Sequence, residues 1–173
     1  MRFRSVCLAA LFVACAAAQG VSQNRSYLVA FASGSSTTTA SANVEELRIY
    51  DLVNRQRSKS GLTFLSWDES LAAIAREYSN RMAAGEFFGH VDPAGSTVKD
   101  RINTSGLRSW RSVGENLFNG RNIDDYPGLA VKMWMNSDSH RANILDTRWS
   151  YAGVGIAKAA DGRVYVTQLY MQK

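Results

Sequence analysis

SWDESLAAIAREYSNRMAAG, residues 66–85, carries the clearest structural signal in this chain. Ser66 and Glu69 are spaced as a capping box, in which Ser66 would cap a helix and Glu69 would reach back to it. Apolar residues then recur at the i, i+3, i+4, i+7 and i+11 positions of one helix face, namely Leu71, Ile74, Ala75, Tyr78 and Met82. This spacing predicts an amphipathic helix that ends at Gly85.

Further helices are indicated before and after this segment. Asn43 followed by Glu46 predicts a helix start. Four apolar residues recur at helical spacing before this helix ends ahead of Gly61, namely Val44, Leu47, Tyr50 and Val53. Residues 98–102 are expected to form one or two short helical turns. Pro127 is favoured in a first turn and predicts another helix, with Ala130, Met133 and Trp134 facing inward.

The C-terminal part changes to the alternating pattern of strands. Apolar residues alternate at Ala152, Val154 and Ile156, and again from Val164 onward. The Asp-Gly pair at residues 161–162 separates the two runs and predicts a β-hairpin. A sheet and helices must cover each other's apolar faces. We therefore expect an α+β fold whose layers combine helices with a small, mostly antiparallel sheet.

The N-terminal 18 residues have the pattern of a secretory signal peptide. Arg2 and Arg4 precede an apolar run over residues 6–18, and residues 16–18 offer a small-residue cleavage site. The run is shorter than the roughly 20 residues of a membrane-spanning helix, so no transmembrane helix is expected. Residues 11–15 loosely resemble a bacterial lipobox, in which Cys15 would carry a lipid instead.

Composition narrows the class of protein. Residues 19–42 are expected to be a flexible Ser/Thr-rich tail, and residues 43–173 the folded domain. Both cysteines, Cys7 and Cys15, lie in the predicted signal segment, so the mature domain would lack disulfides, which favours a bacterial exported protein. The net charge of +5 is spread among acids, which argues against nucleic acid as a partner. Nothing indicates the oligomeric state.

Three short motifs contain the candidate site residues. His90 and His140 are the two histidines of the chain, and Glu115 stands between Gly114 and Asn116. Two imidazoles and a carboxylate match the ligands of an open zinc centre. Simpler roles remain open, because His90 could bind a carbonyl beside Pro93, His140 could brace a loop, and Glu115 could form a salt bridge. No metal-binding helix motif such as His-Glu-x-x-His is present.

Ser137 lies three residues before His140 and allows two interpretations. A serine nucleophile would need a histidine within hydrogen-bond reach and a third group to orient that histidine. No Gly-x-Ser-x-Gly motif supports this arrangement. Ser137 is equally suited to cap the turn that carries His140.

Taken together, these motifs resemble the CAP superfamily, also called the SCP domain, from about Val44 to Tyr170. The resemblance is carried by GLTFLSWD with Leu71, by Phe88-Gly89-His90, by Gly114-Glu115-Asn116 and by residues 134–145. It implies a three-layer α-β-α sandwich. It also implies a central cleft in which two histidines hold a divalent metal, commonly zinc, beside two glutamates. His90, His140 and Glu115 match this set, whereas the second glutamate is replaced by Ser137.

The resemblance leaves two main functions open. The first is an exported, non-enzymatic module, secreted or held at the bacterial cell envelope, whose cleft binds metal and a lipid, cell-wall or protein ligand. The second is a metal-assisted hydrolase or peptidase with Glu115 as the base. Two histidines alone would hold a metal weakly, which favours the first. A cleft without function, on a domain that acts through its surface, is a third alternative.

Overall fold

The computed structural model describes residues 43–85 and 87–173. The predicted signal peptide, the Ser/Thr-rich tail and Cys15 lie outside the described residues. The elements are α1 (Val44–Lys59), β1 (Ser66–Trp67), α2 (Glu69–Gly85), α3 (Val98–Thr104), β2 (Ser112–Arg121), α4 (Tyr126–Met135), α5 (Asp138–Leu145), β3 (Tyr151–Lys158) and β4 (Arg163–Gln172). Among these residues no helix is both long and apolar enough to cross a bilayer.

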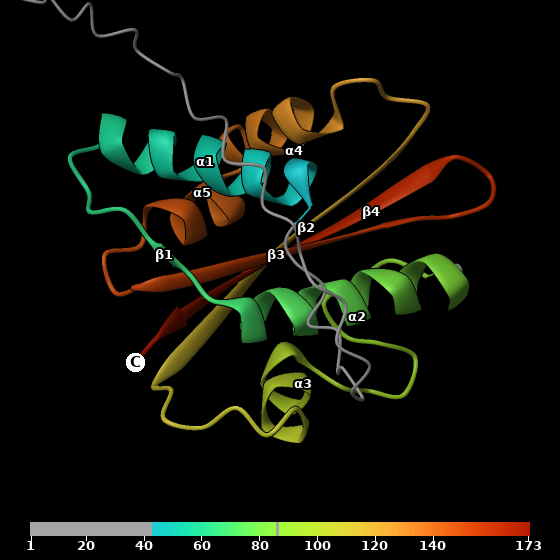
Figure 1. The fold of residues 1–173 in the computed structure, drawn as a ribbon, viewed down its shortest axis with the longest axis horizontal. Helices are drawn as coiled ribbons and strands as arrows, with labels where there is room; N and C mark the ends of the chain where they lie inside the picture. Colours follow the sequence, from blue (N-terminus) through green and yellow to red (C-terminus); the bar gives the residue numbers. More distant parts are fainter. Residues whose placement is uncertain (1–42, 86) are drawn as a thin grey trace, which may run out of the picture. The chain divides into compact units, whose positions relative to one another are not determined.

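A four-stranded sheet forms the middle layer, in the order β1-β3-β4-β2. Strand β4 pairs antiparallel with both β2 and β3, while the short β1 runs parallel to β3. Helices α1, α4 and α5 cover one face, and α2 and α3 cover the other (Figure 1). The predicted α+β sandwich with a small, mostly antiparallel sheet is confirmed.

The sheet is buried on both faces, because alternate residues of β4 enter different cores. Val164, Val166 and Tyr170 pack with the α1, α4 and α5 side. Leu169 and Met171 join the core beneath α2 and α3. The predicted hairpin is confirmed between β3 and β4, where Gly162 has a φ of +81°. Such a backbone conformation is costly for other residues, which explains the glycine at this turn.

Helix α2 buries the predicted apolar face, but its predicted cap is wrong. Ser66 belongs to β1, where its backbone N–H donates to Ser150, and the helix begins at Glu69. Asp68 takes the capping role, since its Oδ1 accepts from the backbone N–H of Leu71 at 3.1 Å. Because Ser66 pairs with β3 as part of β1, the helix begins later than the capping box of Ser66 and Glu69 predicted.

Two other predicted apolar faces are partly wrong. The capping box of Asn43 and Glu46 is present at the start of α1. However, Val44 is 80% exposed and Leu47 41% exposed, while the buried face of α1 includes Glu46, Asn54 and Arg57. These buried polar groups have partners; Asn54, for example, bonds the backbone of Leu65 in both directions. In α4, Ala130 and Trp134 are buried as expected but Met133 is exposed.

Candidate functional site

The two histidines lie together in the folded chain. His90 comes from the loop between α2 and α3, and His140 from α5. Their ring centroids are 6.4 Å apart and their planes are inclined by 35°. Two segments separated by fifty residues thus present imidazoles at adjacent positions, which the spacing of the sequence by itself did not indicate.

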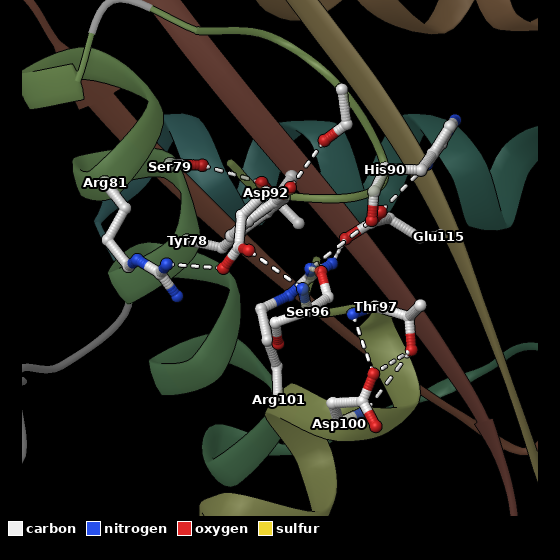
Figure 2. A network of polar contacts seen from close by, with 12 residues as sticks. Tyr78, Ser79, Arg81, His90, Asp92, Ser96, Thr97, Asp100, Arg101 and Glu115 are labelled. Carbon is white, nitrogen blue, oxygen red and sulfur yellow. Dashed lines mark hydrogen bonds and ion pairs between the residues drawn. The ribbon is translucent and has the colours of Figure 1, made fainter. Parts of the chain in front are cut away.

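Glu115, on β2, is the buried anchor of His90. Its Oε1 lies 2.8 Å from Nδ1 of His90, and its Oε2 accepts from Nη2 of Arg101 at 2.5 Å (Figure 2). The Glu115 side chain is 3% exposed, whereas that of His90 is 57% exposed. Because Nδ1 of His90 faces Glu115, Nε2 is the ring nitrogen left for another partner.

Ser137 occupies the cap position of α5 but makes no capping hydrogen bond. Its Oγ instead lies 2.8 Å from Nδ1 of His140. The site therefore consists of two pairs, Glu115 with His90 and Ser137 with His140. These contacts do not form a serine–histidine–glutamate relay, because the glutamate contacts a different histidine from the serine.

The environment of His140 favours its neutral form. Burial, and secondarily the nearby His90, lower the pKa of His140 from its ordinary value of 6.5. A neutral imidazole is the form that binds metal ions. His140 is thus uncharged near neutral pH, with Nδ1 facing Ser137.

Arg101, on α3, supports Glu115 and is the residue that the sequence prediction missed. It is 7% exposed, and its guanidinium group lies 3.4 Å above the Tyr78 ring. Nη1 also donates to the Ser96 carbonyl at 3.2 Å and to the His90 carbonyl at 3.4 Å. Its position in a seven-residue helix carries no motif, because its role depends on α3 packing beside β2.

The loop that carries His90 is held by Asp92. Oδ1 of Asp92 accepts from the backbone N–H groups of Ala94 at 2.9 Å and Ser96 at 2.8 Å, and Oδ2 accepts from Arg81. The backbone hydrogen bond from Ser96, assisted by Arg81, lowers the pKa of Asp92 below its usual value of 3.8. Figure 2 shows this cluster on the α2 side of Arg101.

Two asparagines hold α5 against β2 and so position His140. Asn143 Nδ2 donates to the Glu115 carbonyl at 3.0 Å and to Asn116 Oδ1 at 2.9 Å. Asn116 Nδ2 donates to the His140 carbonyl at 3.1 Å. Gly114 of β2 also packs closely against this region. A Cβ added to Gly114 would lie 3.0 Å from Trp149 and 3.3 Å from Asn143.

The available ligands define what the site can bind. Within residues 43–85 and 87–173, no group of three or more His, Cys, Asp or Glu side chains could hold a metal ion. Glu115 is engaged by Arg101 and His90, so the salt bridge considered as its simpler role is also present. A metal ion at this place would have two imidazoles from the protein, with water or a ligand in its other positions.

Comparison with known proteins identifies the family and agrees with the fold. Residues 50–170 match the family described as CAP, the cysteine-rich secretory protein family. The chain belongs to this family. Over 134 residues it is 34% identical to the uncharacterized protein YkwD of Bacillus subtilis (strain 168), a match that covers 76% of this chain and 50% of YkwD.

Solved structures of other proteins show the same architecture. An extracellular SCP-domain protein from Bacillus anthracis str. Ames is 30% identical, with a TM-score of 0.64 over 75% of this chain and 40% of that one. An outer surface protein from Borrelia burgdorferi is 24% identical, with a TM-score of 0.65 over 72% of this chain and 90% of that one. The chain spans half or less of the two Bacillus proteins.

Proposed function

We propose that this CAP domain is an exported ligand-binding module that holds a divalent metal ion, preferably zinc, between His90 and His140. The arrangement of the Nδ1 atoms carries the proposal. Nδ1 of His90 faces Glu115 at 2.8 Å, and Nδ1 of His140 faces Ser137 at 2.8 Å. Each ring therefore keeps Nε2 for an external partner, and histidine ligands of metal ions are commonly oriented by such contacts at the other nitrogen.

The two rings lie close enough to share one ion after a small shift. Zinc–nitrogen bonds are about 2.0–2.1 Å long, so two imidazoles that share an ion have centroids a few ångströms on either side of it. The centroids of His90 and His140 are 6.4 Å apart. Tetrahedral zinc would bring them to about 5 Å, so binding would require the rings to move about 1 Å closer. The Ser137 hydroxyl can accept from Nδ1–H of His140, which is the tautomer that offers the Nε2 lone pair to the ion.

The shortage of protein ligands favours binding over catalysis. Two imidazoles leave open positions for an external group, and a lipid headgroup, a cell-wall fragment or a protein side chain could supply it. Export is supported by the signal-peptide pattern of residues 1–18 and by the likeness to an extracellular Bacillus anthracis protein. Attachment through Cys15 would place the same module at the cell envelope.

The hydrolase alternative assigns Glu115 as the base, and the contacts of this residue argue against that role. Both carboxylate oxygens are already engaged, one by Arg101 and the other by His90. A general base must lie within hydrogen-bond reach of the proton that it takes. Glu115 is better placed to orient His90 than to activate a water on the far side of that ring.

Calorimetry with zinc at pH 7.5 tests the proposal, on untagged protein and on the His90→Ala/His140→Ala double variant. We expect one zinc ion to bind per chain, and binding to be lost in the double variant, because imidazole supplies both protein ligands. Circular dichroism would verify that the variant is folded. Equal binding by the two proteins, or no binding by either, would overturn the metal site.

A further inference from the structure

A cavity lies away from the histidine pair, at the hairpin end of the sheet. It has a volume of about 690 Å³ and is lined by the end of α2, by Phe87 and Phe88, by the end of β2 and by the β3–β4 turn. Figure 1 shows that α2 ends on the same side of the molecule as this turn. Along β2, Arg121 at this cavity is six residues from Glu115, or about 20 Å at 3.4 Å per residue.

One wall of the cavity is aromatic. It contains Phe87, Phe88 and Tyr165. The Phe88 and Tyr165 rings are 6.5 Å apart and tilted by 49°. Phe88 is 49% exposed although it is a large apolar side chain, while Tyr165 is only 5% exposed. Phe88 therefore presents an accessible ring beside a buried one, a surface suited to a flat apolar group.

The rest of the lining is polar and has an excess of positive charge. Among the described residues that line the cavity, Arg121 and Arg163 face a single acid, Asp161. Asp161 pairs closely with Arg121 and lies 3.9 Å from Nε of Arg163. Nη1 of Arg163 donates to the neutral Asn119 side chain at 3.2 Å. Arg163, 37% exposed at its side chain, thus keeps donors for a further anion.

We propose that this cavity binds a small aromatic carboxylate, whose ring packs against Phe88 and Tyr165 and whose carboxylate pairs with Arg163. The volume falls within the range of about 300–1,000 Å³ that is typical of small-molecule sites. The planar guanidinium group matches a carboxylate geometrically. The lining has one more arginine than acidic residues, which favours a monoanion over a phosphate dianion. The aromatic side chains favour a ring over an acyl chain.

Calorimetry with 2-naphthoate, the neutral 2-naphthamide and the aliphatic anion hexanoate tests the chemistry of the site. We expect saturable one-to-one binding of 2-naphthoate, and at least tenfold weaker binding of each of the other two probes. The amide lacks the charge that Arg163 recognises, and hexanoate lacks the ring. Absence of saturable 2-naphthoate binding, or equal affinities for all three probes, would overturn the proposal.

Matched variants locate the site. Phe88→Ala and Arg163→Gln are each expected to weaken 2-naphthoate binding at least tenfold. Phe64→Ala, at another exposed phenylalanine, and Arg108→Gln, at an arginine outside the cavity, should leave it unchanged. The His90→Ala/His140→Ala variant should also retain it, which separates this site from the proposed metal site. Equal weakening by the control variants, or unchanged binding in Phe88→Ala and Arg163→Gln, would contradict the assignment.

Discussion

Glu115 shows how a single buried carboxylate organises the candidate metal site. It accepts from Arg101 on one oxygen and from His90 on the other, so it connects α3, β2 and the histidine loop. Charge-assisted hydrogen bonds of this kind are short and directional. The orientation of His90, whose side chain is more than half exposed, depends on this one buried partner.

Glu115→Gln is expected to weaken zinc binding about 10–100-fold, the usual cost of removing a group that orients a metal-binding histidine. The amide would leave Arg101 without its counter-charge and His90 without its carboxylate. Calorimetry at pH 7.5 measures the effect, with Glu45→Gln, at a partly exposed glutamate of α1, as the control. If zinc affinity stayed the same while a hydrolytic activity disappeared, Glu115 would be the base and the orienting role would be wrong.

Asp92 makes the histidine loop sensitive to acid. Its folded-state pKa is lowered, chiefly by the backbone hydrogen bond from Ser96, so its contribution to stability is present above its unfolded pKa, about 3.8. That contribution is lost as the pH falls through the lower folded-state pKa. We expect Asp92→Asn to be less stable than the natural protein at pH 7, with the difference shrinking below pH 4.

Thermal unfolding at a series of pH values measures this convergence. Asp51→Asn, at an exposed position of α1, serves as the control and should follow the natural protein throughout. A constant difference between Asp92→Asn and the natural protein from pH 7 to pH 2 would show that ionisation of Asp92 does not stabilise the loop.

At the scale of elements, α2 packs closely on β3. Gly153 and Gly155 of β3 lie beneath the helix backbone. A Cβ at Gly153 would lie 2.3 Å from the backbone nitrogen of Ala72, and one at Gly155 would lie 2.0 Å from that of Arg76. Backbone atoms cannot move aside as a flexible side chain does, so these glycines set the distance between helix and sheet.

Gly155→Ala is therefore expected to lower the free energy of unfolding by at least about 1–3 kcal/mol, the usual cost of overpacking a core. Urea denaturation followed by tryptophan fluorescence measures the change. Gly89→Ala is the matched control, because a Cβ there would meet its nearest atom at an ordinary 3.5 Å. Equal stability of the two variants would mean that α2 can shift without cost.

At the scale of the whole molecule, Glu46 joins elements from the two helical layers at an edge of the sheet. Strand β1 pairs with β3 only at residues 151–152, and no other strand of the described residues pairs along that edge. Glu46 of α1 is 1% exposed, and its Oε1 accepts from the backbone N–H of Ile156 at 3.3 Å. It also pairs with Arg76 of α2 at 2.8 Å. The ion pair thus covers an edge that would otherwise expose backbone groups.

Glu46→Ala is expected to cost about 3–5 kcal/mol of unfolding free energy, the range for removing one partner of a buried ion pair. Chemical denaturation provides the measurement. Glu45→Ala, one residue earlier and with a partly exposed side chain, should change stability by no more than about 0.5 kcal/mol. A similar small change for both variants would show that the edge of β3 does not need this contact.

Local patterns in the sequence determined the elements whose signals are local. The spacing of Leu71, Tyr78 and Met82 predicted α2, and the Asp161-Gly162 turn predicted the β3–β4 hairpin; both are present. The spacing of apolar residues indicates which face of an element can be buried. Burial of apolar area is the dominant favourable contribution to folding. The same reasoning wrongly predicted that Val44, Leu47 and Met133 are buried, because the buried face of a helix depends on what packs against it.

Tertiary structure alone decided how the candidate site is assembled. The motifs singled out His90, Glu115, Ser137 and His140, and their roles in metal binding remain predictions. Only the packing of α3 and α5 beside β2 divides them into two contacting pairs and recruits Arg101. Contacts between residues far apart in the chain carry no local signal, because their geometry arises when the sheet and its helices close on each other.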